Sequence, residues 1–211
     1  MKRIMIFIII IISIAKVEAL NVTLDSCIDG DTARFIVNNQ SVKVRFLSIN
    51  APEIEGEDKK AEYMGEEAKN YTCELLTNAK NIKLEFDNNS DKKDKYDRLL
   101  AWIWIDDNLL QELLVKKGLV KVDYIYDEYL YVPYLCQIEK NAYNNKIGIW
   151  SKEKKLGYCT KVEDNNYTLE ELKNSKLEDI EITNPRIFIV IVILFFILFI
   201  FLITIYILKR S

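Results

Sequence analysis

Any chemistry in this chain has to proceed without histidine, because its 211 residues include none. Nucleophilic catalysis by a serine or cysteine that histidine activates is therefore excluded. Carboxylates, lysines, tyrosines, arginines and a bound metal ion remain as the groups that can bind a substrate or move a proton. The candidates are the positions where such groups interrupt apolar segments.

Arginine is rare in this chain and lies inside apolar stretches. Between positions 20 and 185 there are 20 lysines but only three arginines, Arg34, Arg45 and Arg98. A guanidinium can grip two phosphate oxygens at once, whereas an ammonium acts as a point charge, so this placement fits a phosphate clamp. An arginine that is paired with an acid, or that snorkels out of a strand, explains the pattern equally well.

The acidic and amide candidates stand where predicted strands end. Asp29 and Asp31 lie on the tight turn DGDT, and Asn50 and Glu53 flank the end of the strand VRFLSI. Oxygen ligands that converge from separate loops suit a hard cation such as Ca²⁺. Taken alone, DGDT is also an ordinary hairpin turn.

The hydrophobic pattern predicts an α+β domain built on a small barrel. Alternating apolar residues predict strands, and helical spacing predicts three helices. The expected order is strands at 20–28, 32–37 and 41–49, a helix at 57–78, strands at 81–86 and 98–105, a helix at 109–117, an extended segment at 119–126 and a helix at 133–145. Five strands are too few for a sandwich and suit the five-stranded oligonucleotide/oligosaccharide-binding (OB) barrel, which has a helix after its third strand.

Seven short segments follow one another in an order and spacing typical of one family. They are IDGDT (28–32), VRFLSINAPE (44–53), YMGEEA (63–68), NAKNIKLEF (78–86), DKYDRLLAWIW (94–104), LVKVDYIY (119–126) and IGIWS (147–151). Over about 130 residues the chain thus resembles the staphylococcal (thermo)nuclease-like domain family. The resemblance implies the same OB barrel.

The resemblance also implies a function and a role for each matching residue. The family's activity is Ca²⁺-dependent cleavage of DNA or RNA, so single-stranded DNA or RNA is the expected substrate. The implied catalytic residues are Arg45 and Arg98, which clamp the scissile phosphate, and Glu53, which positions or deprotonates the attacking water. The implied Ca²⁺ ligands are Asp31, Asn50 and the carbonyl of Ala51. The implied substrate-binding residues are Lys95 and Tyr96 for the terminal phosphate, and Tyr124 and Tyr126 for the nucleotide.

Two positions depart from the family pattern. Asn50 stands where the family has a second aspartate, so Ca²⁺ is expected to bind more weakly. Asp97 stands where the family usually has glycine, and its carboxylate is expected to pair with Arg98 or Lys95 and compete with phosphate. Both changes keep a second hypothesis open, in which the domain is a catalytically weakened module that binds nucleic acid or protein.

The ends of the chain predict export and membrane attachment. Residues 1–19 have the basic start, short apolar run and small residues of a secretory signal peptide, with an uncleaved signal anchor as the alternative. After the nuclease-like domain (20–162), an acidic stalk (163–186) leads to an apolar run (187–208) that is long enough to span a bilayer, and a basic tail (209–211) follows. The prediction is a single-pass type I membrane protein of the secretory pathway or cell surface, with its domain facing the lumen or the outside.

Cysteines and glycosylation motifs agree with export. Four cysteines, Cys27, Cys73, Cys136 and Cys159, lie in the exported part, and an even number there suggests two disulfides. Three pairings are possible, of which Cys136–Cys159 with Cys27–Cys73 is favoured, because the first would hold the tail against the last helix. Acceptor motifs for N-glycosylation begin at Asn21, Asn39, Asn70, Asn88 and Asn166.

Overall fold

The computed structural model describes residues 19–56, 60–163, 165–175 and 193–201. Residues 17–169 form one compact unit, and residues 1–16 and 170–211 form another. The strands of the first unit are β1 (Ala19–Cys27), β2 (Thr32–Val37), β3 (Gln40–Phe46), β4 (Ile49–Asn50), β5 (Ile82–Glu85), β6 (Leu99–Ile105), β7 (Asn108–Leu109) and β8 (Lys121–Val122). Its α-helices are α2 (Gly65–Asn78), α3 (Leu110–Lys116) and α4 (Val132–Asn144), followed by 3₁₀ turns at Gly148–Ser151 and Tyr158–Lys161.

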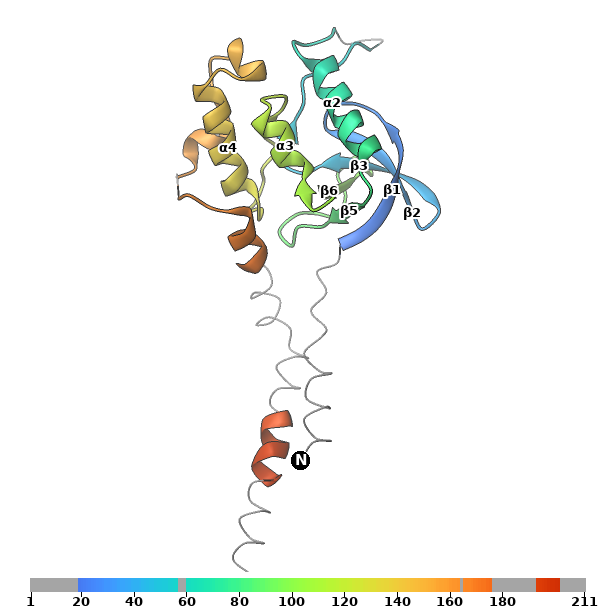
Figure 1. The fold of residues 1–211 in the computed structure, drawn as a ribbon, viewed down its shortest axis with the longest axis vertical. Helices are drawn as coiled ribbons and strands as arrows, with labels where there is room; N and C mark the ends of the chain where they lie inside the picture. The colour runs from blue at the N-terminus through green and yellow to red at the C-terminus, as the bar shows by residue number, and fades with distance from the viewer. Residues whose placement is uncertain (1–18, 57–59, 164, 176–192, 202–211) are drawn as a thin grey trace, which may run out of the picture. The chain divides into compact units, whose positions relative to one another are not determined.

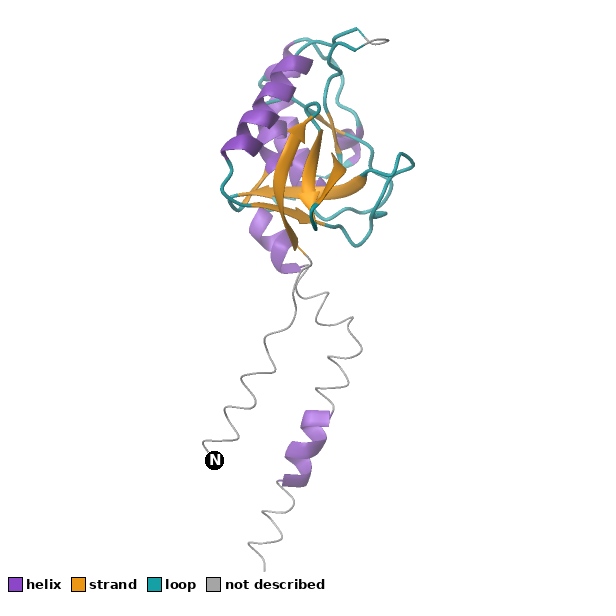
Figure 2. Cartoon of the chain, turned by 90° about the vertical axis from the view of Figure 1, so that its right-hand side faces the viewer, coloured by secondary structure: helices purple, strands orange, loops and turns teal. Residues whose placement is uncertain are grey.

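The five long strands close into a barrel, which confirms the predicted α+β, OB-like fold (Figures 1 and 2). The sheet runs β3-β2-β1-β5-β6-β7, and an additional parallel pairing between β3 and β6 joins its two sides. The other pairs in this sheet are antiparallel. In Figure 2 helices lie to the left of the strands and behind them, and loops project on the right.

The strands form where apolar residues alternate, and β6 is buried on both of its faces. In β2, Ala33 and Phe35 are buried while Arg34 between them is exposed, as expected for a strand with one face in the core. In β6, residues 101–105 are all buried, because the barrel interior lies on one side of this strand and α3 contacts the strand as well. Two short strands, β4 and β8, pair with each other outside the main sheet.

Two predicted elements have different limits in the structure. The strand expected at 41–49 breaks after Phe46, because Ser48 takes a positive φ of 60° before β4 begins. The helix expected at 57–78 begins only at Gly65. Residues 60–64 are not helical, since the Glu62 amide donates to the carbonyl of Glu53 (2.8 Å) and the Glu53 amide donates to the Glu62 carboxylate (3.0 Å).

Two buried carboxylates at the end of β5 hold the barrel together. Trp104 donates its indole N–H to Glu85 (2.5 Å), and Trp102 donates its own to Asp87 (2.9 Å). The ring of Tyr131 meets both indoles edge-on, and its hydroxyl donates to Glu85. Because buried indole and phenol groups need hydrogen-bond partners, this pairing lets β6 place two tryptophans in the interior.

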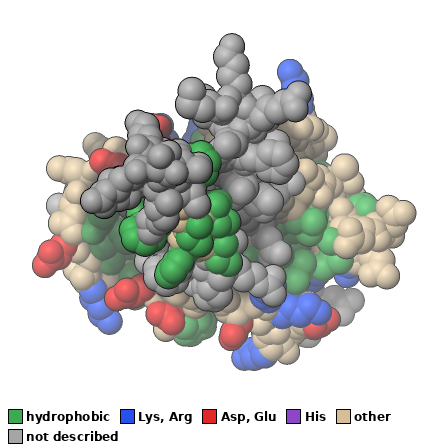
Figure 3. Space-filling view, turned by 90° about the horizontal axis from the view of Figure 1, so that it is seen from below, with side chains coloured by type: hydrophobic (Ala, Val, Ile, Leu, Met, Phe, Trp, Pro, Cys, Tyr) green, Lys and Arg blue, Asp and Glu red, His purple; other side chains and the backbone are tan. Residues whose placement is uncertain are grey.

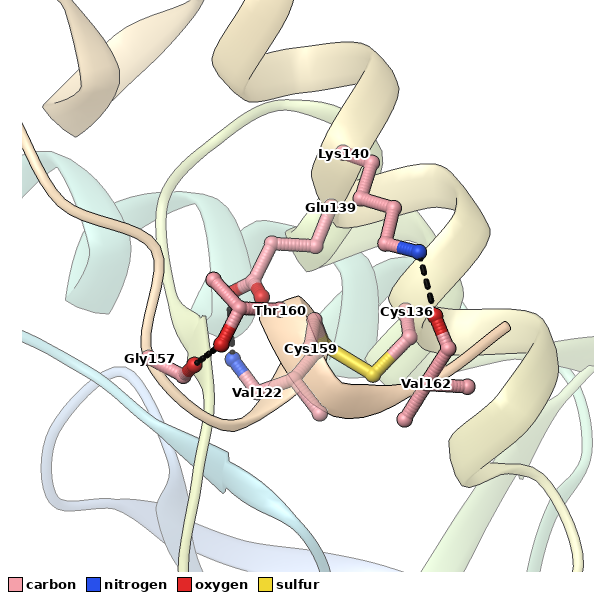
Figure 4. Close-up of a disulfide and its surroundings, with 8 residues drawn as sticks. All are labelled: Val122, Cys136, Glu139, Lys140, Gly157, Cys159, Thr160 and Val162. Atoms are coloured by element: carbon pink, nitrogen blue, oxygen red, sulfur yellow. Dashed lines mark hydrogen bonds between the residues drawn. A yellow bond between two sulfur atoms is a disulfide. The ribbon is translucent and has the colours of Figure 1, made fainter. Parts of the chain in front are cut away.

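The two disulfides are Cys27–Cys73 and Cys136–Cys159, which confirms the favoured pairing. Figure 4 shows the second of them, between α4 and the 3₁₀ turn Tyr158–Lys161, with Lys140 donating to the carbonyl of Val162 (2.5 Å) alongside. The C-terminal end of the predicted domain is therefore fixed to α4.

The predicted terminal segments fall largely outside the described residues. Of the predicted signal peptide only residue 19 is described, and of the predicted membrane span only residues 193–201, which are helical. Within the described ranges no helix has both the length and the apolarity needed to cross a membrane.

Glu139 on α4 is a buried acid that supports the short strand β8. The residue is fully buried, and one carboxylate oxygen accepts the amide of Val122 (2.7 Å; Figure 4). Its other oxygen is buried with no hydrogen-bond partner in the described structure. Burial raises the pKa of Glu139 to about 7, so the neutral form is favoured in the folded chain.

We therefore expect Glu139 to make stability depend on pH near neutrality. The folded chain binds this proton more tightly than the unfolded chain, so its stabilising contribution is complete below the ordinary pKa of 4.5 and is lost as pH rises through about 7. Urea unfolding at pH 5.5, 7 and 8 should show a steeper loss of stability in wild type than in Glu139→Gln. The exposed Glu74→Gln serves as control and should keep the wild-type slope, and equal slopes in all three proteins would contradict the assignment.

Candidate active site

The structure brings Asp31, Arg45 and Ala51 together in a buried corner between β2, β3 and β4. One oxygen of Asp31 accepts the amide of Ala51 (2.6 Å) and lies 3.1 Å from a terminal nitrogen of Arg45. Its other oxygen accepts the hydroxyl of Thr32 (2.9 Å). The register of β2 and β3 makes this possible, because Thr32 and Arg45 are direct partners. A turn and two strand ends thus converge on one carboxylate.

The carboxylate of Asp31 is poorly solvated in this corner. Burial raises its pKa to about 6, even though the adjacent Arg45 acts in the opposite direction, and the nearby Asp29 adds to the rise. The ionised form of a carboxylate in this position would be stabilised by a further positive charge, which a bound cation can supply.

Arg45 is held in place from two sides. One of its terminal nitrogens donates to the carbonyl of Phe46 (2.9 Å), while the other faces Asp31. Its guanidinium lies 5.5 Å from the ring centre of Tyr124, a cation–π distance. Tyr124 has a positive φ of 58° and is half exposed, and Tyr126 is 82% exposed. Tyr124 therefore offers ring surface to solvent beside Arg45, and Tyr126, two residues further along, is exposed as well.

The second arginine, Arg98, is oriented by an acid that sequence reasoning missed. Asp94 accepts the Nε of Arg98 at 2.6 Å, and its other oxygen accepts the backbone amides of Tyr96 and Arg98 (2.9 Å each). The Arg98 guanidinium and the Lys95 ammonium lie 5.4 and 5.0 Å from the ring centre of Tyr96. The four-residue spacing and the Asp-led turn were the signals that could have revealed Asp94.

The barrel closure places Arg98, the residue just before β6, next to the strand that carries Arg45. In the parallel pair of β3 and β6, Arg45 lies opposite Leu100, two residues after Arg98. The loop of Asp94 and Arg98 therefore enters the barrel beside the strand that carries Arg45.

The expectation for Asp97 was wrong. Its carboxylate pairs with Lys93 (2.6 Å), and both side chains are well exposed. It pairs with neither Arg98, whose partner is Asp94, nor Lys95. Asp97 has a φ of 62°, in the left-handed region that glycine adopts most easily. This conformation accounts for the glycine that usually stands at this position in the family that the sequence resembles.

Glu53 lies two residues beyond Ala51 in the chain. Its side chain is exposed, whereas its backbone is fixed: the carbonyl accepts the amide of Glu62, and a Cβ added to Gly65 at the start of α2 would lie 2.4 Å from that carbonyl oxygen. Only glycine allows this close approach. The close packing against Gly65 at the start of α2 therefore fixes the position of the Glu53 backbone.

The oxygen groups here fit a hard cation in type but bring little charge. The described residues contain no cluster of three or more acidic, histidine or cysteine side chains. Asp31 provides one carboxylate, which accepts the Ala51 N–H and so holds the chain at Asn50 and Ala51 beside it. The Asn50 side chain is half-buried. Carboxylate, amide and carbonyl oxygens together are a set that calcium accepts.

The structure is a small OB-like barrel that carries a buried carboxylate, Asp31, paired with Arg45, and a neighbouring loop in which Asp94 pairs with Arg98. A family model described as "Staphylococcal nuclease homologue" matches residues 43–152. The chain belongs to this family.

Curated relatives carry nuclease names. The chain is 39% identical over 144 residues to endonuclease YncB of Bacillus subtilis, covering 68% of this chain and 66% of that protein. It is 38% identical to the SPbeta prophage-derived endonuclease YokF of the same organism, of which it covers 47%. It is 32% identical over 124 residues to the thermonuclease of Staphylococcus hyicus, covering 59% of this chain and 72% of that protein. The chain thus spans just under two thirds and about half of the first two relatives.

Substitutions of the neighbouring acids Asp94 and Asp97 are expected to have different effects on activity. Replacing Asp94 with alanine frees Arg98 and the turn, so if Arg98 binds phosphate as the family resemblance implies, nucleic-acid cleavage should slow by about ten- to a hundredfold. Asp97→Gly removes only an exposed ion pair, so its rate should stay within about twofold of wild type. Equal losses in the two variants, at temperatures where both remain folded, would contradict the role given to Asp94.

Proposed function

We propose that this chain is a Ca²⁺-dependent endonuclease that hydrolyses phosphodiester bonds of single-stranded DNA or RNA. The observation that carries the proposal is the buried cluster of Asp31, Arg45 and Ala51 beside the loop of Arg98. Membership of the nuclease family supports it.

The two arginines provide the phosphate clamp. Each is held by a carboxylate, Arg45 by Asp31 and Arg98 by Asp94, so both are oriented before a substrate arrives. The charge on phosphate oxygens grows during displacement, and fixed guanidinium groups stabilise that charge without reorganising. Arg45 is nearly buried, where this interaction is strengthened by the low local dielectric.

Glu53 acts on the attacking water, and Asp31, Asn50 and the carbonyl of Ala51 hold the cation. When bound, calcium supplies positive charge to a phosphate oxygen and fixes the phosphate within the cluster. The exposed carboxylate of Glu53, on a backbone fixed by α2, can orient water or accept its proton.

The exposed tyrosines bind the bases and sugars. Tyr124 and Tyr126 present ring faces on which any base can stack, so little sequence preference is expected, and Tyr96 lies with Lys95 where a terminal phosphate is expected. Lys95 supports a terminal phosphate. On the face drawn in Figure 3, acidic and basic side chains alternate around the edge of the described part.

The proposed setting is a single-pass type I membrane protein whose nuclease domain faces the secretory lumen or the outside. The apolar run at 187–208 and the apparent signal at 1–19 motivate it. Two disulfides support an oxidising compartment, because such bonds persist there and are rare in the cytosol.

Cleavage of single-stranded DNA by the full-length protein tests the enzyme directly. Activity should appear at millimolar calcium and vanish with a chelator. Glu53→Gln should lower the rate by about 10²- to 10⁴-fold while oligonucleotide binding persists, because only the proton-transfer group is lost. Glu55→Gln, two residues away and also exposed, should behave as wild type. Binding without cleavage by the wild type would favour the binding module instead.

Substitution of Asn50 by aspartate tests the metal site. A second carboxylate should lower the calcium concentration that gives half-maximal activity by about tenfold, since affinity for Ca²⁺ rises with the charge of its ligands. Asn39→Asp, in the turn between β2 and β3, adds the same charge away from the corner and should leave this concentration unchanged. An unchanged calcium requirement in Asn50→Asp would remove Asn50 from the cation site.

A further inference from the structure

The turn that carries Asp31 is fastened to α2 by adjacent contacts. The disulfide Cys27–Cys73 joins the end of β1, four residues before Asp31, to the middle of α2. Next to Cys73, the buried hydroxyl of Thr72 donates to the carbonyl of Gly30 (2.9 Å). One covalent bond and one buried hydrogen bond therefore connect successive helix residues to the two sides of this turn.

Close packing leaves this turn almost no freedom to shift. A Cβ added to Gly30 would lie 2.7 Å from the Cβ of Ala51 and 2.8 Å from that of Ala68. Gly30 is thus wedged between α2 and the segment that carries the proposed metal ligands. A movement of the turn away from the helix would change the distance between Asp31 and the Ala51 amide.

The same helix braces the other side of the corner. Its first residue, Gly65, lies against the carbonyl of Glu53, while Ala68, Thr72 and Cys73, further along, contact or bond the turn. α2 therefore acts as a common support for the two acidic residues of the site. The disulfide is its only covalent link to the turn within the described structure.

We propose that Cys27 and Cys73 are positioning residues for the cation site, and that their disulfide makes calcium binding depend on the oxidised state of this pair. The inference rests on the proposed nuclease function. Reduction by a dithiol such as dithiothreitol converts the disulfide to two thiols and the dithiol to its own disulfide. The turn then keeps only the Thr72 hydrogen bond and packing, and Asp31 spends less time within reach of Ala51.

The second disulfide provides a matched control within the same molecule. Cys136–Cys159 joins α4 to the 3₁₀ turn at the end of the domain, and the groups drawn around it in Figure 4 include none of the proposed site residues. Its loss removes one covalent link of the same kind without touching the turn of Asp31. General loss of stability and loss of positioning can therefore be separated.

The test compares Cys27→Ser/Cys73→Ser with Cys136→Ser/Cys159→Ser in the full-length chain. Three quantities are measured: the exchange rate of the Ala51 amide by NMR, which reports its bond to Asp31 without any metal, calcium affinity by calorimetry, and cleavage of single-stranded DNA. In the first variant the Ala51 amide should exchange faster and the calcium dissociation constant should rise about tenfold, equivalent to about 1.4 kcal/mol. Reduced wild type should match it, and reoxidation should restore both values.

The control variant should keep wild-type Ala51 exchange and calcium affinity, whatever its melting temperature. An unchanged calcium affinity in folded Cys27→Ser/Cys73→Ser, with active wild type, overturns the inference and leaves the proposed function standing. An equal shift in both variants also overturns it. A wild-type chain that neither binds calcium nor cleaves DNA overturns the proposed function and the inference with it.

Should Cys27→Ser/Cys73→Ser fail to fold, Thr72→Val carries the test. This variant keeps the disulfide and removes the neighbouring hydrogen bond to Gly30. Faster exchange of the Ala51 amide and weaker calcium binding in this variant would show that α2 positions the turn of Asp31. Wild-type values for both quantities would overturn the inference that α2 positions this turn.

Discussion

The carboxylate of Asp31 is the point on which the rest of the site depends. It accepts the Ala51 amide and faces the guanidinium of Arg45, so three separate strand ends are joined through one buried side chain. Such a group is costly to bury unless its oxygens are satisfied. The barrel supplies those partners from β2, β3 and β4, and the turn around Gly30 is packed tightly enough to keep them there. Family membership tells what kind of chemistry to expect, and this carboxylate shows how the chain assembles it.

Much of this arrangement could be predicted from the sequence, because the signals were local. Alternating apolar residues gave the long strands, whereas of the three rare arginines only Arg45 lies buried within a strand and Arg34 is exposed. The favoured disulfide pairing rested on one bridge, Cys136–Cys159, expected to hold the tail against the last helix, and the other two cysteines then had only each other. Predictions were less accurate where the backbone takes positive φ: Ser48 splits one predicted strand, and Met64 precedes a helix that starts later than expected. Serine and methionine do not favour positive φ, so these conformations could not be predicted from the sequence. Tertiary contacts impose them.

Asp94 and Asp97 show why side-chain pairing was harder to predict than fold. Both acids stand within four residues of Arg98, and the sequence cannot say which of them faces it. The turn decides, because Asp94 accepts two backbone amides and so points inward, whereas the left-handed Asp97 is directed to Lys93. Hydrogen bonding by backbone amides, which sequence patterns do not encode directly, assigned each acid its partner.

The parallel pairing of β3 with β6 has a consequence for how the protein is made. Arg45 is synthesised more than fifty residues before Arg98, and the segment that follows Arg98 meets the strand of Arg45 only when β6 docks against β3. This is a long-range closure, of the kind that forms late because the entropy of a long intervening segment must first be lost. A nascent chain that ends within β5 therefore has Arg45 but not the segment of Arg98 that β6 brings beside it. Under the proposed function, nuclease activity is expected only once β6 is complete and the barrel has closed.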